Sequence, residues 1–422
     1  MCDRIVPACK LISCHREAMP EQQFISADCF RQFAQRVLVK AGLSPGEVSD
    51  VIEPLVYASL RGIDTHGVRN FKSYYVDTII DGSIDPQATI DVEFETPMSA
   101  RANGRNGLGL VAAAWGMRLA IEKASASGIG MVCIRNSNHL GAAGYFAYLA
   151  IEHDMIGVSM SGHLYGEGTS RGMAPVFSLQ PMFGTNPFGV AIPCEKEPPY
   201  ILDMSTSVVP VNRVEFARDR GESIPIGWCL DAEGNPTSDP ATAKIYLPLG
   251  GARETGGHKG FGLAMIVEAM TALLSAGWAD ENGSYSQDKI AHFLGAFRID
   301  MFREPSEFKT AMDAMLDSSG ALADGSDLGD APVTLQVQAG QTQSITLSLP
   351  NHESRTVQVG TSQSSISVRL RRRSGRGMAQ TTMAEAEAPV MVETPVPMNE
   401  APATMTSTTM SSGTDNRDPW AQ

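Results

Sequence analysis

The strongest constraint on the fold of this chain is an alternation of helical and strand-like apolar patterns between Ile25 and Ala276. From Ile25, apolar side chains recur at the i, i+3, i+4 spacing of a helix that Ser26 can cap, and a second helix is predicted after Pro45. Short apolar runs that suit strands separate the later helical segments. This order predicts an α/β fold. The predicted strands cover residues 129–134, 156–160, 188–192 and 200–203, and the further helices cover 107–123, 141–153 and 260–276.

Changes in composition divide the chain into regions. Residues 1–24 show no periodicity and are interpreted as a loose leader. After Gly320, residues 333–370 alternate apolar and polar side chains as edge-like strands do. From about residue 374 onward Ala, Thr, Met, Pro and Ser dominate, a composition that predicts disorder. We therefore expect a leader (1–24), a folded region (25–320) and a divergent extension (321–422).

Charge and cysteine content exclude several classes of protein. A net charge of −14 disfavours non-specific nucleic-acid binding, and the basic run 369–376 leaves such a contact only as a minor alternative. No run approaches the roughly 20 apolar residues of a membrane helix. The seven cysteines form no C-x-x-C pair, which predicts a reducing cytoplasm and no disulfide framework. Cys9, Cys14 and His15 lack the remaining ligands of a zinc site, so no metal is predicted.

The usual nucleotide-binding signatures are missing. Gly104, Gly107 and Gly109 have the spacing G-x-x-G-x-G rather than the G-x-G-x-x-G of a Rossmann turn, and residues 251–259 lack the G-K-[ST] of a phosphate loop. If a dinucleotide binds to this chain, the sequence predicts that it binds outside a Rossmann turn.

One loop gathers ionisable side chains. Residues 61–69 place Asp64, Thr65, His66 and Arg69 between and after two glycines. Histidine titrates near neutrality, so His66 could carry a proton, and an arginine can hold a carboxylate through paired hydrogen bonds. The alternative is a helix-connecting loop whose His and Arg are solvated.

Three shorter segments have less specific patterns. Residues 137–144 follow a predicted strand and begin a helix, whose free N–H groups suit a phosphate or a carboxamide. The alternative is that Ser137 or Asn138 only caps this helix and that His139 lies at the surface. Residues 184–187 form a tight turn that carries Thr185. Asp203 ends an apolar run, where it could orient a histidine or cap a helix that starts near residue 207.

The most unusual segment is 250–260, in which glycines surround His258 and Lys259 directly before a long helix. Flexible backbone, a cation and a helix N-terminus together favour a diphosphate site over a linker. The helix that follows has a broad apolar face formed by Leu263, Ile266, Val267, Met270 and Leu274.

In this order, these segments resemble the malate/L-lactate dehydrogenase family, which is unrelated to the Rossmann lactate dehydrogenases. The resemblance covers residues 25–316, and the ordered set is specific although each motif alone is weak. It implies a multi-domain fold with its own cofactor domain at about 90–260, built on a mixed, largely antiparallel sheet, and a homodimer. The motifs are 60–68 (LRGIDTHGV), 137–145 (SNHLGAAGY), 184–187 (GTNP), 202–209 (LDMSTSVV), 227–231 (GWCLD), 247–251 (LPLGG) and 256–260 (GGHKG).

The resemblance also implies residue roles. His66 matches the proton donor to the substrate carbonyl oxygen, and Thr65, where the family usually has serine, would orient it together with Asp203. The family's substrate arginine falls on Asn70 here, with Arg69 one place earlier. Residues expected at the substrate are Arg69, Asn70 and Thr185, and those expected along NAD or NADP are Asn138, His139, Gly141, Met204 and Ser205, with His258, Lys259 and Gly260 near the phosphates; Arg213 stands in place of a usual lysine.

Two functions follow as hypotheses. The first is an NAD(P)-dependent oxidoreductase that transfers a hydride to or from a small 2-oxo or 2-hydroxy acid. The second is a relative without catalysis that binds a nucleotide or a protein partner.

Overall fold

A computed structural model describes residues 25–163, 172–277, 290–319, 343–347 and 355–359. The predicted leader and the disorder predicted from about residue 374 lie outside the described residues. All described residues fall within one compact unit, 1–372.

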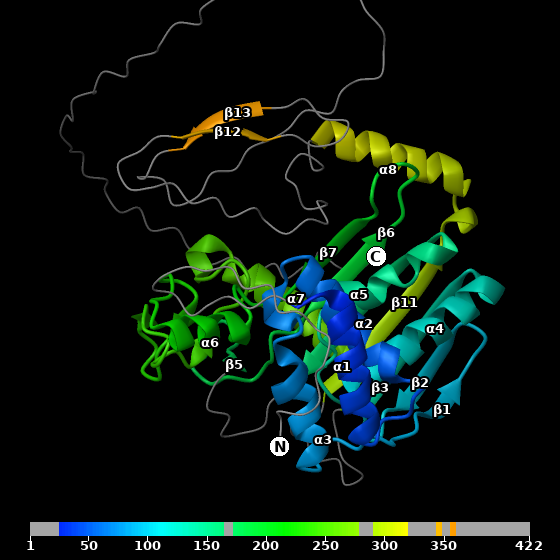
Figure 1. Ribbon diagram of the computed structural model, residues 1–422, viewed down its shortest axis with the longest axis horizontal. Helices are drawn as coiled ribbons and strands as arrows, with labels where there is room; N and C mark the ends of the chain where they lie inside the picture. Colours follow the sequence, from blue (N-terminus) through cyan, green and yellow to red (C-terminus); the bar gives the residue numbers. More distant parts are fainter. Residues whose placement is uncertain (1–24, 164–171, 278–289, 320–342, 348–354, 360–422) are drawn as a thin grey trace, which may run out of the picture. The chain divides into compact units, whose positions relative to one another are not determined.

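A seven-stranded sheet with the order β1-β2-β3-β11-β4-β6-β7 forms the centre of the fold (Figure 1). Only β2 and β3 pair in parallel, and the other neighbours are antiparallel. The predicted α/β class and the mixed, largely antiparallel sheet are therefore confirmed. The strands are β1 (Asp91–Glu95), β2 (Ser99–Asn103), β3 (Ile129–Ser137), β4 (Met155–His163), β6 (Phe188–Ile192), β7 (Tyr200–Met204) and β11 (Ile290–Arg298).

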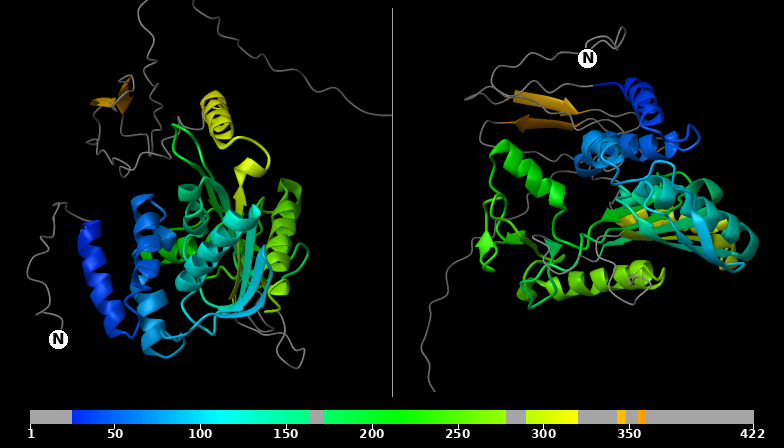
Figure 2. Two further views of the ribbon diagram at one scale, coloured as in Figure 1. Left: turned by 90° about the vertical axis from the view of Figure 1, so that its right-hand side faces the viewer. Right: turned by 90° about the horizontal axis from the view of Figure 1, so that it is seen from below.

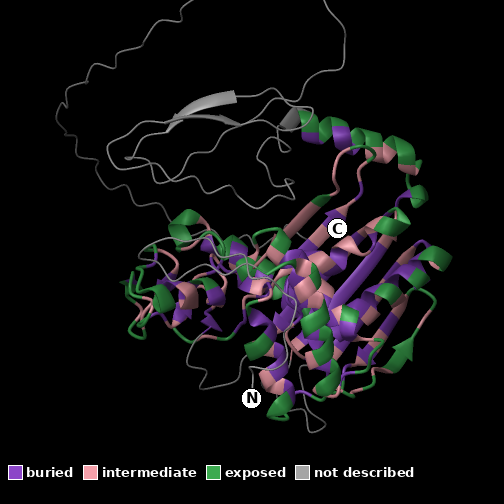
Figure 3. Cartoon of the chain, in the orientation of Figure 1, coloured by how far each residue is buried: buried purple, intermediate pink, exposed green. Residues whose placement is uncertain are grey.

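Glycines allow helices to lie directly on one face of this sheet. A Cβ on Gly130 of β3 would fall 1.8 Å from the carbonyl oxygen of Ala120, and one on Gly157 of β4 would fall 2.0 Å from that of Ala147. The helices that contribute these carbonyls, α4 (Gly109–Ser127) and α5 (Ala143–Tyr148), are covered in turn by α2 (Val48–Leu60) and α1 (Ala27–Lys40) (Figure 2, left). Figure 3 shows the resulting core as buried strands beneath helices with exposed outer faces.

The opposite face of the sheet carries α7 (Gly257–Glu268), which continues as the π-helix η5 (Ala269–Leu273). Only part of the predicted apolar face of this helix meets the sheet. Val267 is buried and Met270 is half-buried, but Leu263, Ile266 and Leu274 are 38%, 54% and 54% exposed, whereas Ala264 and Thr271 are buried.

A smaller part of the unit is built around α6 (Val211–Arg220) and a four-stranded sheet with the order β5-β10-β8-β9. It has an apolar cluster of its own, which includes Met173, Val214 and Tyr246. The strands are β5 (Gly172–Met173), β8 (Cys229–Leu230), β9 (Pro236–Thr237) and β10 (Ile245–Tyr246).

Several predicted boundaries need correction. The helix predicted at 141–153 is the short α5 followed by a 3-10 turn, η3 (Ile151–His153), and the helix predicted near residue 207 starts only at Val211, after Pro210. Asp203 therefore caps no helix there. The remaining elements are α3 (Asp77–Ile80), α8 (Pro305–Ser319), η1 (Asp64–His66), η2 (Phe71–Val76), η4 (Arg253–Thr255) and η6 (Ile299–Met301).

Other predictions are confirmed in detail. The Ser26 hydroxyl accepts the Cys29 amide at 3.2 Å and caps α1. Two strands, β12 (Gln343–Leu347) and β13 (Arg355–Val359), pair within the part of the extension where strands are expected. Cys133, Cys194 and Cys229 carry free thiols, but Cys29 is disulfide-bonded, so the expectation of reduced cysteines is wrong at that position.

Candidate active site

The loop between α2 and η2, residues 61–70, is called the histidine loop below. Its 3-10 turn, η1, places the buried Thr65 directly before His66, and the Thr65 hydroxyl lies 2.8 Å from Nδ1 of His66. This contact fixes the plane of the imidazole and leaves Nε2 as the nitrogen available to a ligand.

Two side-chain amides bind the same carbonyl oxygen of the histidine loop. The Thr65 carbonyl oxygen accepts hydrogen bonds from Nδ2 of Asn70 at 2.8 Å and from Nδ2 of Asn212 at 2.6 Å. Tyr74 donates its hydroxyl to Oδ1 of Asn212 at 2.7 Å. The amide of Asn70 is therefore committed to shaping the loop, and Asn212 ties the loop to the first turn of α6.

His139 lies against His66. The two rings are stacked, with centroids 5.5 Å apart and planes inclined by 16°. The Tyr75 hydroxyl lies 3.0 Å from Nδ1 of His139. The alternative that placed His139 at the surface is wrong, and the structure brings together two segments that the sequence separates by more than 70 positions.

Burial keeps these imidazoles uncharged. It lowers the pKa of His66 to about 4 and that of His139 to about 3, the latter with a further contribution from the neighbouring histidines. Both rings are therefore neutral at pH 7, able to accept a proton or to donate a hydrogen bond.

Sequence reasoning missed a third histidine beneath this pair. His292 in β11 is fully buried, with Nε2 at 2.9 Å from the Ser137 hydroxyl and Nδ1 at 3.1 Å from the Ser161 hydroxyl. It thereby joins β3 and β4 where the segment with Asn138 and His139 leaves β3. Its only sequence signal is one polar residue inside an apolar strand.

The segment after β3 is packed tightly on the start of α4. Asn138 donates its amide to the Gly107 carbonyl at 2.8 Å, and a Cβ on Gly109 would lie 1.9 Å from the Asn138 carbonyl oxygen. Gly141 has a φ of +80°, which favours glycine. These residues therefore set the path of the backbone around His139.

Asp203 does not reach His66. It faces the start of α5, where it accepts the Gly144 amide, and among the described residues its second oxygen is buried without a hydrogen-bond partner. Burial raises the pKa of Asp203 to about 6. The relay expected between Asp203 and the imidazole is not formed. Met204 ends the same edge strand, and Ser205 follows it and donates its hydroxyl to the Ser207 carbonyl.

The turn at Thr185 is anchored by a buried carboxylate that the sequence did not single out. Asn186, at a φ of +42°, donates to Oε1 of Glu268 at 2.8 Å and accepts the His163 amide at 3.2 Å. Burial raises the pKa of Glu268 to about 7. The turn that carries Thr185 is therefore tied to α7, the helix whose first turn contains His258 and Lys259.

Arg69 is directed away from His66. Its guanidinium donates to Asp219 at 2.8 Å and lies 3.7 Å above the ring of Phe216, both on α6. The side chain is 49% exposed. The structure thus does not bring Arg69 to the imidazole.

The glycine-rich segment forms a loop with unusual backbone. Gly250, Gly251 and Gly256 have φ values of +97°, +74° and +104°. Backbone atoms crowd Gly257 and Gly260, where a Cβ would lie 2.0 Å and 2.3 Å from the nearest atom. The side chains of His258 and Lys259 are exposed in the first turn of α7, where the amides of Gly257 and Lys259 donate to the carbonyls of Ala252 and Gly256 and no side chain caps the helix.

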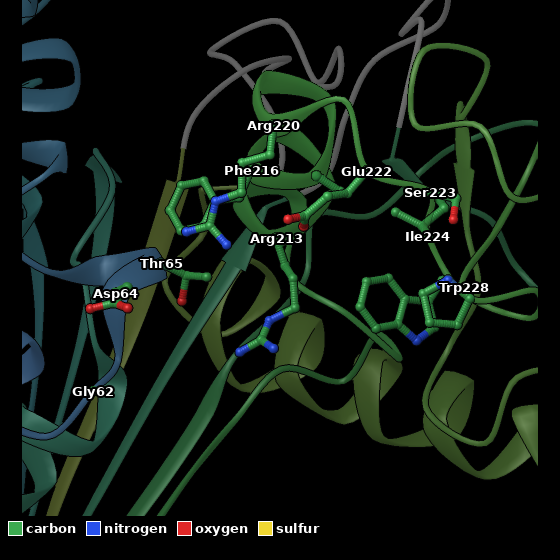
Figure 4. Close-up of a pocket in the computed structure, with 12 residues that line it drawn as sticks. Gly62, Asp64, Thr65, Arg213, Phe216, Arg220, Glu222, Ser223, Ile224 and Trp228 are labelled. Carbon is green, nitrogen blue, oxygen red and sulfur yellow. The ribbon is translucent and has the colours of Figure 1, made fainter. Parts of the chain in front are cut away.

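A cavity of about 250 Å³ opens beside the histidine loop (Figure 4). One wall is the loop itself, through Asp64 and Thr65, and the other is α6 with the segment that follows it. Among the described residues no group of three or more His, Cys, Asp or Glu side chains is arranged to hold a metal ion. No described helix has both the length and the apolar character needed to cross a membrane.

Comparison with known proteins identifies the family. The sequence pattern of the malate/L-lactate dehydrogenases matches residues 25–328. The chain belongs to the malate/L-lactate dehydrogenase family. The resemblance inferred from the ordered motifs is thereby confirmed.

Relatives within this dehydrogenase family are similar over most of their length. The chain is 40% identical to a malate dehydrogenase of Pyrococcus abyssi over 69% of its own residues and 80% of the relative. It is 34% identical to a ureidoglycolate dehydrogenase (NAD(+)) of Escherichia coli O157:H7, over 59% of this chain and 68% of that protein. The crystal structure of malate dehydrogenase from Entamoeba histolytica matches with a TM-score of 0.64 and 33% identity, covering 70% of this chain and 84% of that one.

Proposed function

We propose that this protein oxidises and reduces small 2-hydroxy and 2-oxo acids with NAD or NADP, and that His66 exchanges the proton with the substrate oxygen. The observation that carries the proposal is the half-buried, neutral imidazole of His66, held at Nδ1 by Thr65 and stacked on His139. Membership of a dehydrogenase family supports it. One relative is named as NAD(+)-dependent, and NADP rests on the sequence prediction alone.

The residues of the glycine-rich loop fit a dinucleotide. The positive φ angles at Gly250, Gly251 and Gly256 turn the backbone where side chains would obstruct it, and α7 begins there with the positive end of its helix dipole and no side-chain cap. Lys259 and His258 would lie near the phosphates, with Asn138, Gly141, Met204 and Ser205 along the rest of the cofactor. This arrangement constitutes the proposed non-Rossmann site. A bound nicotinamide would supply the hydride donor or acceptor.

The protonation state of His66 defines its task in each direction. A neutral imidazole can accept the proton of the substrate hydroxyl as the hydroxy acid is oxidised. In the reverse direction, negative charge develops on the carbonyl oxygen, and a protonated His66 relieves it. Because burial lowers the pKa of His66 to about 4, a bound anion must raise that pKa before the protonated form becomes available for reduction.

We further propose that the protein is a homodimer; its location in the cytoplasm stays a prediction from the sequence, which the disulfide at Cys29 does not support. The exposed apolar side chains of α7 and η5 support the dimer, since Ile266, Leu273 and Leu274 are each at least half exposed in a single chain. The mass of the protein in solution by light scattering tests this directly: a monomeric mass at micromolar concentration would contradict it.

Turnover is tested with a panel of 2-oxo acids, NADH and NADPH, followed by the absorbance of the reduced cofactor. We expect oxidation of the cofactor with at least one acid. Tight binding of NADH or NADPH with no turnover of any acid would instead support the second hypothesis, a non-catalytic nucleotide-binding relative.

A further inference from the structure

The substrate carboxylate needs a cation, and the residue expected to supply it is already engaged. Arg69 is paired with Asp219 and stacked on Phe216, while Asn70, which falls where the family has its arginine, holds the Thr65 carbonyl. A different cation must therefore orient an acid beside His66 if the proposed function is correct.

The cavity beside the histidine loop offers one. On the α6 side it is lined by Arg213, Phe216, Ala217 and Arg220, which follow the i, i+3, i+4, i+7 spacing of one helix face. In Figure 4, Arg213 extends between Thr65 and Trp228. Neither guanidinium forms a hydrogen bond or ion pair with the rest of the described chain.

Arg213 lies in the turn of α6 that is tied to the histidine loop. The preceding residue, Asn212, donates to the Thr65 carbonyl at 2.6 Å, and the Thr65 hydroxyl lies 2.8 Å from Nδ1 of His66. The first turn of α6 is therefore fixed on the histidine loop through a buried amide. An anion held by Arg213 would lie next to this loop.

The remaining wall residues restrict what the cavity can take. Asp64 and Glu222 line it as well, so its four charged side chains carry no net charge before a ligand enters. Anions must then be held by direct hydrogen bonds from guanidinium groups, which pair with carboxylates through two parallel donors. Ile224, Pro225 and Trp228 give the far wall an apolar character that suits a short carbon chain.

We propose that this cavity binds the acid substrate, that Arg213 holds its carboxylate, and that Arg220 favours acids with a second anionic group. The inference rests on the proposed dehydrogenase function and names the substrate class of that site. It assigns to Arg213 the substrate-binding role that was predicted for Arg69.

The test compares Arg213→Met, Arg213→Lys and Arg220→Met with Arg218→Met, a matched control at an exposed arginine of α6 that does not line the cavity. Steady-state rates are measured with oxaloacetate, which has two carboxylates, and with pyruvate, which has one. We expect Arg213→Met to raise KM for both acids on the order of 10- to 100-fold, the loss of a charge-assisted hydrogen-bonded pair. KM for NADH should stay unchanged, and Arg213→Lys should restore part of the loss. Arg220→Met should raise KM for oxaloacetate only.

A second measurement keeps this inference separate from the proposed function. Tartronate, a 2-hydroxy dicarboxylate, is titrated calorimetrically into the wild type and the Arg213→Met variant, each saturated with NAD⁺. If the wild type reduces no acid, the proposed function fails, but weaker tartronate binding to the variant still supports the pocket. Equal tartronate affinity in the wild type and in Arg213→Met overturns the proposed pocket. So does an effect of Arg213→Met on KM for NADH alone. A third contrary result would be a raised KM for the acids in Arg69→Met with no change in Arg213→Met.

Discussion

Replacing His292 should remove part of the acid sensitivity of the protein. This imidazole is fully buried between two serine hydroxyls, and burial lowers its pKa from 6.5 to about 3. Between these pH values the unfolded chain binds a proton at His292 that the folded chain does not bind. Stability therefore rises with pH through this window and is lost as the pH falls below about 6.5.

The magnitude follows from the pKa values. A pH of 5.0 lies about 1.5 units below the pKa of the imidazole in the unfolded chain, which is therefore protonated, while the imidazole in the folded chain is still neutral. Each pH unit corresponds to about 1.4 kcal/mol of unfolding free energy. Acidification from pH 7.5 to 5.0 should thus cost about 2 kcal/mol through His292 alone. In His292→Gln, which keeps a donor and an acceptor for the serines, that part of the loss should disappear.

The assay is urea unfolding followed by tryptophan fluorescence at pH 7.5, 6.0 and 5.0. His153→Gln serves as the control, because it changes the same residue type at an exposed position. A loss of unfolding free energy between pH 7.5 and 5.0 that is equal in the wild type and in His292→Gln would refute the reasoning.

Four further substitutions test the residues around the site and along α7. Gly109→Ala places a methyl group against the Asn138 carbonyl, so it should lower the free energy of unfolding by about 3 kcal/mol and weaken NADH binding. Gly262→Ala has open space around it and should raise the free energy of unfolding by roughly 0.5–1 kcal/mol. Urea unfolding and NADH titration distinguish the two variants. Burial raises the pKa of Glu268 from 4.5 to about 7, so its contribution to stability falls as the pH rises through this range. Glu268→Gln should therefore be on the order of 2–3 kcal/mol more stable than the wild type at pH 8 and similar to it at pH 5, and equal unfolding curves at pH 8 would contradict this. Asn212→Ala should lower kcat on the order of tenfold without changing NADH affinity, because it frees one side of the histidine loop; an unchanged kcat would show that the tether is dispensable.

Periodicity predicted most of the core because local pattern and burial agree there. The first helix, its Ser26 cap and the strand 188–192 lie where apolar spacing places them. The pattern was only partly right for the helix 260–276, since Val267 is buried but Leu263, Ile266 and Leu274 face outward. Spacing alone cannot tell which side of an apolar helix meets the core.

The sequence predicted which motifs contribute to the site, but it did not predict the contacts between residues that are far apart in the chain. His66 and Thr65 interact as expected from adjacent residues. The stacking of His66 on His139, the bridge formed by His292 and the diversion of Arg69 to Asp219 each join distant segments. Such contacts depend on the order of the strands in the sheet, which no local motif encodes.

The central claim, that His66 carries the proton, is tested most directly by comparing His66→Ala with the wild type for both turnover and cofactor affinity. We predict that the rate of 2-oxo acid reduction falls on the order of 10²- to 10⁴-fold, while the NADH dissociation constant, measured by fluorescence titration, stays within about twofold. A variant that keeps its turnover, or one that loses NADH binding instead, would contradict the account.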